Sequence, residues 1–455
     1  MRSTRNPVPT VRSRRRAVLR GGFVALAVAL LLPALSTSGA AADRESAQNA
    51  TDNANHNATE NATVISDWNA LAVNTIIADP TKKAPETVLY LSFVQAAVYD
   101  AVVGIHGRYQ PYLLHQDAPR GSSATAAAVA AAHRVLVTYS PYAQATLDSA
   151  YAASLAQIPD GKAKTRGIAF GLGAADNLIT ARANDGRDAP IFFTKPPAPG
   201  VWRPTPPAFA TMLDPWLGSV TPLLVRSATQ FAPPPPPSLT SRQYTRDFLE
   251  VKALGSKTSS ARTPDQTSTA LFYSGSAIVQ FNASLRDQAG KRHLDITDAA
   301  RMFAAVDMAS TDALITVWKA KLDDGLWRPI TAINLADTDG NPATTADPTW
   351  EPVIATPAYP EYSSGYNVLT AAFTGGLAGV FGTDRLDLTM ISTAVPDVRH
   401  YATGRAVRAD VVNARVWLGI HFRTADVVSR DLGLRLTRWA LDHYFQPTHR
   451  GGGDY

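Results

Sequence analysis

The chain has 455 residues, of which 45% are hydrophobic and 18% are charged, and it contains no cysteine. This length and apolar content suffice for one large core or two fused ones, so the composition excludes a disordered chain and a collagen-like fibre. The lack of cysteine also excludes disulfides, thiolate metal sites and a cysteine nucleophile.

The formal net charge of +5 arises in the N-terminal segment. The first 42 residues contain no acidic residue and seven arginines, which are Arg2, Arg5, Arg12, Arg14, Arg15, Arg16 and Arg20. The rest of the chain therefore holds 36 basic and 38 acidic residues, a net charge near −2. This balance does not support nucleic-acid binding, which requires a concentrated positive field.

Residues 1–42 have the pattern of an export signal. An arginine-rich start precedes an apolar stretch from Gly21 to Leu35, and small residues follow it up to Ala42. The stretch is shorter than the roughly 20 residues that span a bilayer, which favours a cleaved signal over an anchor. It resembles the bacterial twin-arginine signal, with an ordinary secretory signal as the alternative. Both predict a secreted or extracytoplasmic protein without a membrane span after signal removal.

Residues 43–63 are rich in Asn, Ala and Thr and predict a flexible leader before a catalytic domain at 64–455. From Val64 onward, apolar residues recur at helical spacing. We expect further helices over 86–103, 122–138, 141–156 and 162–184, which are rich in alanine and bounded by Pro, Gly or Asp-Gly. Alternating strand patterns are scarce, so the sequence predicts an all-α fold.

A proline-dense segment, residues 190–237, separates two helical halves. Solvated linkers seldom carry many large aromatic residues, and this segment contains several, among them Phe192, Phe193, Trp202, Phe209 and Trp216. We therefore expect it to lie over the helices. The second half is predicted to begin near Ser241 and to pack on the first as one helical unit, with the functional motifs at 241–455.

The first motif is Lys321 followed by Arg328-Pro329. Lys321 lies five helical turns after Phe303 and so shares its apolar face, where a lysine needs a partner. The Asp-Gly turn at 324–325 would bring Arg328 back toward Lys321, and the two cations could then converge on one anion. Taken alone, this motif would be better explained by a snorkelling lysine and a surface arginine.

Two further motifs follow. Ser364-Gly365 precedes an apolar run, and a helix beginning there would present a hydroxyl and backbone N–H groups to an anion, the alternative being a simple helix cap. Arg415 and His421 are six residues apart, about 120° around a helix. They can face one ligand only if the helix ends or bends between them, which Gly419 permits.

Together, the three motifs resemble those of the vanadium-dependent haloperoxidases and the type 2 phosphatidic acid phosphatases, which share K-x6-R-P, P-S-G-H and S-R-x5-H. The first motif matches in full. The second has Ser363 for proline and Tyr366 for histidine, and the third has Ala414 for serine. Residues 64–109 and 200–207 are also similar to the secreted bacterial haloperoxidase-like branch.

The resemblance implies a helical haloperoxidase that uses hydrogen peroxide to oxidise halide, in the presence of a small organic acceptor. It implies vanadate held by Lys321, Arg328, Ser364, Gly365 and Arg415, with His421 as the metal ligand. Lys321, Arg328, Ser364, Arg415 and His421 are expected to surround one cavity.

Tyr366 is the catalytic position at which this chain differs from the family. Its side chain is expected to face the oxyanion and donate a hydrogen bond, with low turnover because a tyrosine pKa near ~10 suits proton exchange poorly. The alternatives are a secreted acid phosphatase that acts on a phosphate monoester with His421 as nucleophile, and a non-redox oxyanion-binding protein.

Overall fold

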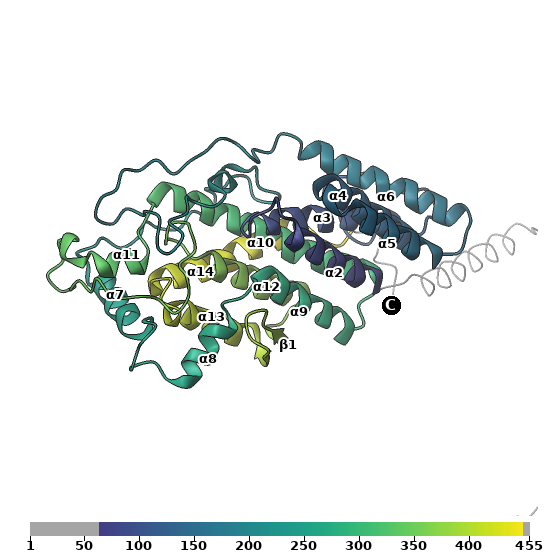
Figure 1. The fold of residues 1–455 in the computed structure, drawn as a ribbon. Coiled ribbons are helices and arrows are strands. Elements are labelled where there is room, and N and C mark those ends of the chain that lie inside the picture. The colour runs from purple at the N-terminus through teal and green to yellow at the C-terminus, as the bar shows by residue number, and fades with distance from the viewer. Residues whose placement is uncertain (1–62, 449–455) are drawn as a thin grey trace, which may run out of the picture. The chain divides into compact units, whose positions relative to one another are not determined.

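The alanine-rich segments of the first half form helices at the expected places (Figure 1). The computed structural model describes residues 63–448, so the predicted export signal and nearly all of the predicted leader lie outside the described residues. The helices of this half are α2 (Thr63–Ala78), α3 (Thr87–His106), α4 (Ala124–Tyr139), α5 (Gln144–Ala156) and α6 (Lys162–Ala181). Their bounds differ from the predicted ones by a few residues.

Small residues allow α4 and α6 to pack closely. The Ser123 side chain accepts a hydrogen bond from the Ala126 N–H and so begins α4, whose face toward the core is lined with buried alanines. A Cβ on Gly171 of α6 would lie 2.1 Å from the Ala127 carbonyl oxygen. Only glycine fits at that approach.

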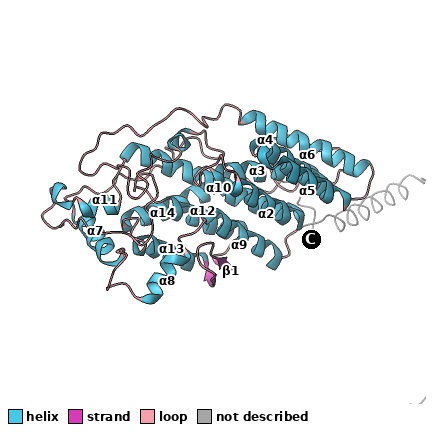
Figure 2. Cartoon of the chain, viewed as in Figure 1, coloured by secondary structure: helices cyan, strands magenta, loops and turns pink. Residues whose placement is uncertain are grey.

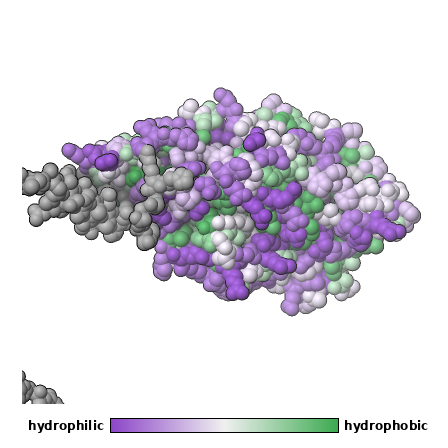
Figure 3. Space-filling view, turned by 180° about the vertical axis from the view of Figure 1, so that it is seen from behind, coloured by the Kyte–Doolittle hydropathy of each residue, from purple (hydrophilic) through white to green (hydrophobic). Residues whose placement is uncertain are grey.

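Helix α3 is long and apolar enough to cross a membrane, and it is the one such helix among the described residues. Of its most apolar window, 89% is buried inside the protein. The molecular face in Figure 3 is mostly hydrophilic, with hydrophobic side chains in small patches. Its burial identifies α3 as a core helix.

The proline-dense segment lies against the helices, as expected. It contains one short 3-10 helix, η2 (Pro215–Ser219), and its Trp202 and Trp216 are buried. Asp312 of α10 (Ile296–Asp324) accepts hydrogen bonds of 2.6–2.8 Å from three consecutive backbone N–H groups, those of Leu223, Leu224 and Val225. By contrast, Phe192 and Phe209 are 71% and 64% exposed.

The second half is also mainly helical (Figure 2). It begins as predicted, because Ser241 caps the first helix by accepting from the Tyr244 N–H. In Figure 1, α10, α12 and α14 lie between α4–α6 on one side and α7 and α11 on the other. The helices besides α10 are α7 (Arg242–Leu254), α8 (Pro264–Phe272), α9 (Ala277–Lys291), α11 (Pro329–Asn334), α12 (Gly365–Phe381), α13 (Gly404–Trp417) and α14 (Arg423–His443).

One β-hairpin was not expected. Strands β1 (Arg385–Ile391) and β2 (Val398–Thr403) pair antiparallel, with Leu388 opposite Tyr401. Its signal was the alternation of Leu386, Leu388 and Met390, which are buried against the core. Apart from this hairpin and isolated bridges, the described residues contain helices and loops, and the predicted all-α class is confirmed.

Helix α10 runs through the centre of the core and is buried over most of its length. It packs against α3 of the first half and α12 of the second, so both halves share one hydrophobic cluster. The described residues fall into one compact unit. The C-terminal end of α10 positions the first motif.

Candidate active site

Lys321 and Arg328 converge on one segment of backbone. Gly325, with φ of 65°, ends α10 one turn after Lys321, and Arg328 directly precedes α11. Both side chains are fully buried. Lys321 Nζ donates to the carbonyls of Pro360 (2.8 Å) and Glu361 (3.1 Å), and Arg328 Nε donates to that of Tyr359 (2.7 Å). The predicted convergence of the two cations is therefore present.

The Tyr359 ring also serves both cations. Lys321 Nζ lies 4.9 Å from the ring centroid, and Arg328 Cζ lies 4.7 Å from it. A desolvated cation gains from the negative face of an aromatic ring. Burial and the charge of Arg328 nevertheless lower the pKa of Lys321 well below its ordinary value. A negative ligand would offset this cost.

His421 reaches the same place because α13 ends before it. The helix stops at Trp417, and Gly419 turns the chain with φ of 78°. His421 Nε2 lies 3.3 Å from Arg328 Nη1, and Nδ1 lies 2.9 Å from Glu361 Oε1. Since arginine can only donate, Nε2 is the acceptor and Nδ1 carries the proton that Glu361 accepts. The Nε2 lone pair thus faces the cations.

The His421 side chain is neutral at neutral pH. Burial, followed by the charges of Arg328, Lys321 and Arg415, lowers its pKa well below the ordinary value. A neutral imidazole can ligate a metal or act as a nucleophile through its unprotonated nitrogen, which here is Nε2 and accepts from Arg328.

Glu361 is the main site residue that the sequence analysis missed. It is fully buried, and its Oε1 also accepts from the Phe422 N–H at 2.9 Å. Burial raises its pKa to about 7, although Arg328 and Lys321 oppose the shift. The available signal was an acidic residue within the apolar, proline-marked stretch before Ser364-Gly365. A carboxylate of this kind fixes the tautomer and orientation of a histidine ligand.

Ser364 and Gly365 stand at the start of α12, as predicted. The buried Ser364 hydroxyl makes no capping bond to the backbone and accepts instead from Asn367 Nδ2 at 3.4 Å. Asn367 also donates to Asp426 Oδ1 at 2.7 Å. Burial raises the pKa of Asp426 well above its ordinary value. A Cβ on Gly365 would lie 3.1 Å from the Trp318 ring.

Arg415 completes the cluster from the last turn of α13. Its Nη1 donates to the Tyr273 carbonyl at 3.0 Å, and its Cζ lies 4.7 Å from the centroid of Tyr366. The charge of Arg415 also contributes to lowering the pKa values of Lys321, Arg328 and His421. The three cations therefore act on one another and on the histidine.

The expected orientation of Tyr366 is wrong. Its hydroxyl donates to Gln280 Oε1 of α9 at 2.8 Å, and its ring covers Arg415. A partly buried hydroxyl still favours a protein partner, and Gln280 supplies it. Burial raises the pKa of Tyr366 above its ordinary value.

The donor set fits a tetrahedral oxyanion. Arg328 Nη2, Arg415 Nε and Ser363 Oγ are buried and have no hydrogen-bond partner among the described residues. Buried donors are normally satisfied, so unpaired ones in a cationic cluster indicate a missing anionic acceptor. Within residues 63–448, no group of three His, Cys, Asp or Glu could hold a metal cation.

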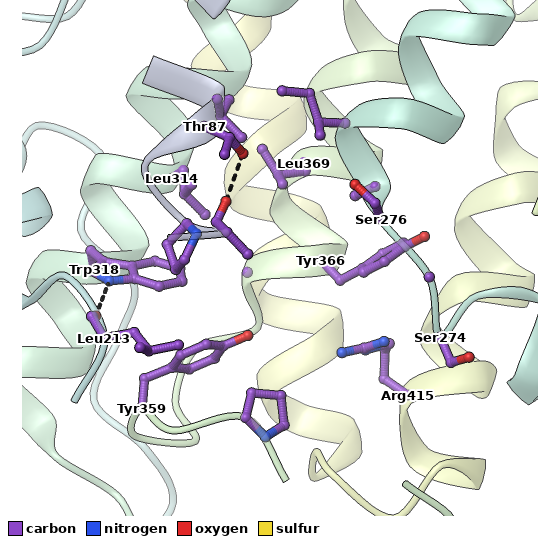
Figure 4. A pocket seen from close by; sticks show the side chains of 18 of the residues that line it. Thr87, Leu213, Ser274, Ser276, Leu314, Trp318, Tyr359, Tyr366, Leu369 and Arg415 are labelled. Carbon is purple, nitrogen blue, oxygen red and sulfur yellow. Dashed lines mark hydrogen bonds between the residues drawn. The ribbon is translucent and has the colours of Figure 1, made fainter. Parts of the chain in front are cut away.

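A cavity of about 450 Å³ borders this cluster (Figure 4). Gly365, Tyr366 and Arg415 line it. Lys321, Arg328, Ser364 and His421 do not line it, so the expectation that five site residues surround one cavity is correct only for Arg415. The other four side chains are buried: Lys321 and Arg328 donate to backbone carbonyls, His421 pairs with Arg328 and Glu361, and Ser364 accepts from Asn367.

Comparison with known proteins relates this arrangement to a family. Residues 301–450, which include all three motifs, match the family model of the VCPO second helical-bundle domain. Vanadium chloroperoxidase of Curvularia inaequalis is 23% identical over 288 residues, 48% of this chain and 47% of that protein. Residues 301–450 thus form a VCPO-type second helical-bundle domain, and the chain is similar to vanadium chloroperoxidase. Its match spans about half the length of this fungal haloperoxidase.

Bacterial vanadium haloperoxidases share the fold over most of the chain. A bacterial vanadium-dependent iodoperoxidase superposes with a TM-score of 0.72 and 23% identity, covering 84% of this chain and 97% of its own. A holo-type bacterial vanadium-dependent chloroperoxidase superposes with a TM-score of 0.65 and 19% identity. This match covers 81% of this chain and 96% of the chloroperoxidase chain.

Proposed function

We propose that this protein is a secreted haloperoxidase that holds vanadate in the buried cluster and uses hydrogen peroxide to oxidise halide. One observation carries the proposal. Unpaired donors of Arg328 and Arg415 belong to the buried cluster of three cations that contains the neutral His421. Export rests on the N-terminal arginine-rich and apolar pattern.

Each residue has a separate task in binding. Lys321, Arg328 and Arg415 would neutralise the oxyanion by charge-assisted hydrogen bonds, the arginines also orienting it through their planar guanidinium groups. Ser364 and the Gly365 N–H would add donors at the positive end of α12. His421 would bind through Nε2. Bound vanadate would supply the activation of peroxide and the oxidation of halide.

Glu361 is the group best suited to hold and release a proton. Its pKa of about 7 lies near the value at which general acid–base catalysis is most efficient. Its Oε1 accepts the His421 Nδ1 proton, whereas Oε2 has no partner among the described residues. The Tyr366 hydroxyl, committed to Gln280, is unsuited to this task.

The same pairing of Glu361 and His421 would also orient a nucleophile for attack on phosphorus, so a phosphatase is the second candidate function. The deciding experiment measures vanadate binding by calorimetry, bromide oxidation with peroxide, and hydrolysis of 4-nitrophenyl phosphate. We expect vanadate binding and peroxide-dependent bromide oxidation. Both should be lost in His421→Ala and retained in His400→Ala, which changes an exposed histidine of β2.

Phosphate hydrolysis without peroxide, inhibited by vanadate and with no halide oxidised, would replace the haloperoxidase with the phosphatase. Vanadate binding with neither halide oxidation nor phosphate hydrolysis would instead support the third alternative, a non-redox oxyanion-binding protein.

A further inference from the structure

The cavity beside the oxyanion cluster is far larger than the inorganic substrates require. A small species such as peroxide or halide has a volume comparable to that of water, roughly 30 Å³ in the liquid. The cavity holds about 450 Å³, within the range of about 300–1,000 Å³ typical of sites for drug-sized ligands. Its size therefore calls for an organic occupant.

The cavity walls are apolar and aromatic. In Figure 4, Trp318 and Tyr359 lie on one side and Tyr366 on the other, with Leu314 and Leu369 above them in this view. The Trp318 N–H is already bonded to the Leu213 carbonyl, and the Tyr366 hydroxyl is bonded to Gln280. These rings therefore present mainly apolar faces to the cavity, which favours a ring-containing ligand.

Arg415 is the one charged side chain in the lining. The lining contains no carboxylate, so a cationic ligand would find no ion-pair partner there. The guanidinium is already covered by the Tyr366 ring and bonded to the Tyr273 carbonyl. Its Nε is buried without a hydrogen-bond partner among the described residues, and the proposed oxyanion would pair with it; once that anion neutralises the one charge in the lining, a neutral organic molecule is the best-matched occupant.

We propose that the cavity binds a neutral, ring-containing organic acceptor beside the oxyanion site, so that the protein selects which molecule is halogenated. This inference rests on the proposed haloperoxidase function, which would supply the hypohalous acid. Halogen transfer forms the C–Br bond as the O–Br and C–H bonds break. The acceptor is oxidised by two electrons, bromine is reduced from +1 to −1, and the ring proton joins the hydroxide to form water.

Binding is tested first without any turnover, using 2-naphthol as the probe. Calorimetry on the purified chain should show saturable 1:1 binding, weakened at least tenfold in Leu369→Trp, which would fill the cavity. Leu369→Met keeps the side-chain volume, and Leu249→Trp makes the same large substitution at a position of α7 that is 51% exposed. Both should bind like the wild type.

Selectivity is tested by competition between 2-naphthol and arbutin, a neutral phenol with a bulky, polar sugar. With bromide and peroxide, the protein should brominate 2-naphthol several-fold more, relative to arbutin, than free hypobromous acid does. Leu369→Trp should return the ratio to that of the free reagent. The ratio is independent of how fast bromide is oxidised, so a slow variant can still be scored.

If Leu369→Trp does not fold, as judged by circular dichroism, Ile354→Trp fills the cavity from a partly exposed position. No binding of 2-naphthol to the wild type, or a product ratio equal to that of the free reagent, would overturn the inference. If bromide is not oxidised at all, the haloperoxidase function fails, and calorimetry alone then decides whether the cavity binds a neutral ring.

Discussion

At the scale of single residues, Tyr366 has a different task from the one its place in the second motif suggests. Its hydroxyl is held by Gln280, and its ring lies against the guanidinium of Arg415. The ring stabilises a cation to which we assign a part in the proposed anion binding. The feature that matters is therefore the aromatic face, and removing the hydroxyl should cost little anion affinity.

This predicts an order of vanadate affinities. Tyr366→Phe keeps the ring and should bind vanadate within about threefold of the wild type, whereas Tyr366→Leu should bind it several-fold to about 30-fold more weakly, the effect of roughly 1–2 kcal/mol of cation–π stabilisation. Calorimetry at one pH measures both. Equal affinities in the two variants would show that the ring does not support Arg415.

Tyr366→His tests the proton-exchange role separately. An imidazole with a pKa near ~6.5 would restore the family's residue, and general acid–base catalysis is typically worth roughly 10²–10⁴-fold. We expect higher halide oxidation or phosphoester hydrolysis. Unchanged turnover in a folded, vanadate-loaded variant would show that this position does not limit the chemistry.

The pKa of Glu361 gives a pH-dependent prediction. Since it is about 7, Glu361 is mostly neutral at pH 6 and mostly charged at pH 8, where its charge repels an anion. Glu361→Gln should therefore raise vanadate affinity at pH 8 and change it little at pH 6. Comparing variant and wild type at each pH cancels the titration of vanadate itself. An equal ratio at both pH values would mean that Glu361 does not titrate in this range.

The sequence was sufficient to predict that Lys321, Arg328 and His421 come together, because helix period, an Asp-Gly turn and one glycine determine their directions, but it wrongly placed them around the cavity. It did not indicate Glu361 or the contact between Tyr366 and Gln280. Those pairings join residues 60 and 86 positions apart, and such contacts depend on how helices pack rather than on local pattern.

At the scale of elements, α10 carries two buried carboxylates in opposite situations. Asp312 accepts three backbone N–H groups of the proline-dense segment, and burial raises its pKa to about 6. Asp307 Oδ2 has no hydrogen-bond partner among the described residues, and burial raises its pKa to about 7. Asp312 attaches the proline-dense segment to the core. Asp307 lowers the free energy of unfolding when its carboxylate is charged.

The two should respond oppositely to amide substitution. The folded pKa of Asp307 lies above its unfolded value, so its charge destabilises the protein as pH rises from about 4 through 7. Asp307→Asn should raise the free energy of unfolding at pH 8 by up to about 4 kcal/mol, because each unit of pKa shift corresponds to about 1.4 kcal/mol. Near pH 4, where Asp307 is neutral in the folded protein, the substitution should give no gain in stability. Asp312→Asn should lower it by about 1–3 kcal/mol because an acceptor is lost.

Urea unfolding at pH 4.5 and 8 measures both variants. A loss of stability in Asp307→Asn at pH 8 would show that its carboxylate is paired in solution.

The elements themselves were largely predictable, because long alanine-rich segments with clear caps leave few alternatives. The β1–β2 hairpin was missed because its alternation is short and lies between helices. The partners of each helix were also not readable from the sequence, since many apolar faces are chemically alike.

At the scale of the whole molecule, the candidate site draws on both halves of the chain. Thr87 and Val88 at the start of α3 line the cavity together with Leu213 of the proline-dense segment and Arg415 of α13. The oxyanion-binding residues all come from the second half. The cavity is lined by residues of both halves and shares Gly365 and Arg415 with the set proposed to bind the oxyanion.

The attachment of the proline-dense segment by Asp312 has a consequence for a cut chain. Proteases cleave preferentially at exposed loops, and the segment exposes Phe192 and Phe209 well before the three bonds at Leu223–Val225. A cut near Phe209 would sever the backbone but leave α10 packed against α3. Asp312 of α10 would also stay hydrogen-bonded to Leu223, which follows the cut. Limited chymotrypsin digestion should yield two bands on a denaturing gel and one peak of unchanged size in gel filtration. The halves should then reassemble when expressed as separate polypeptides, so the protein would be suited to fragment complementation.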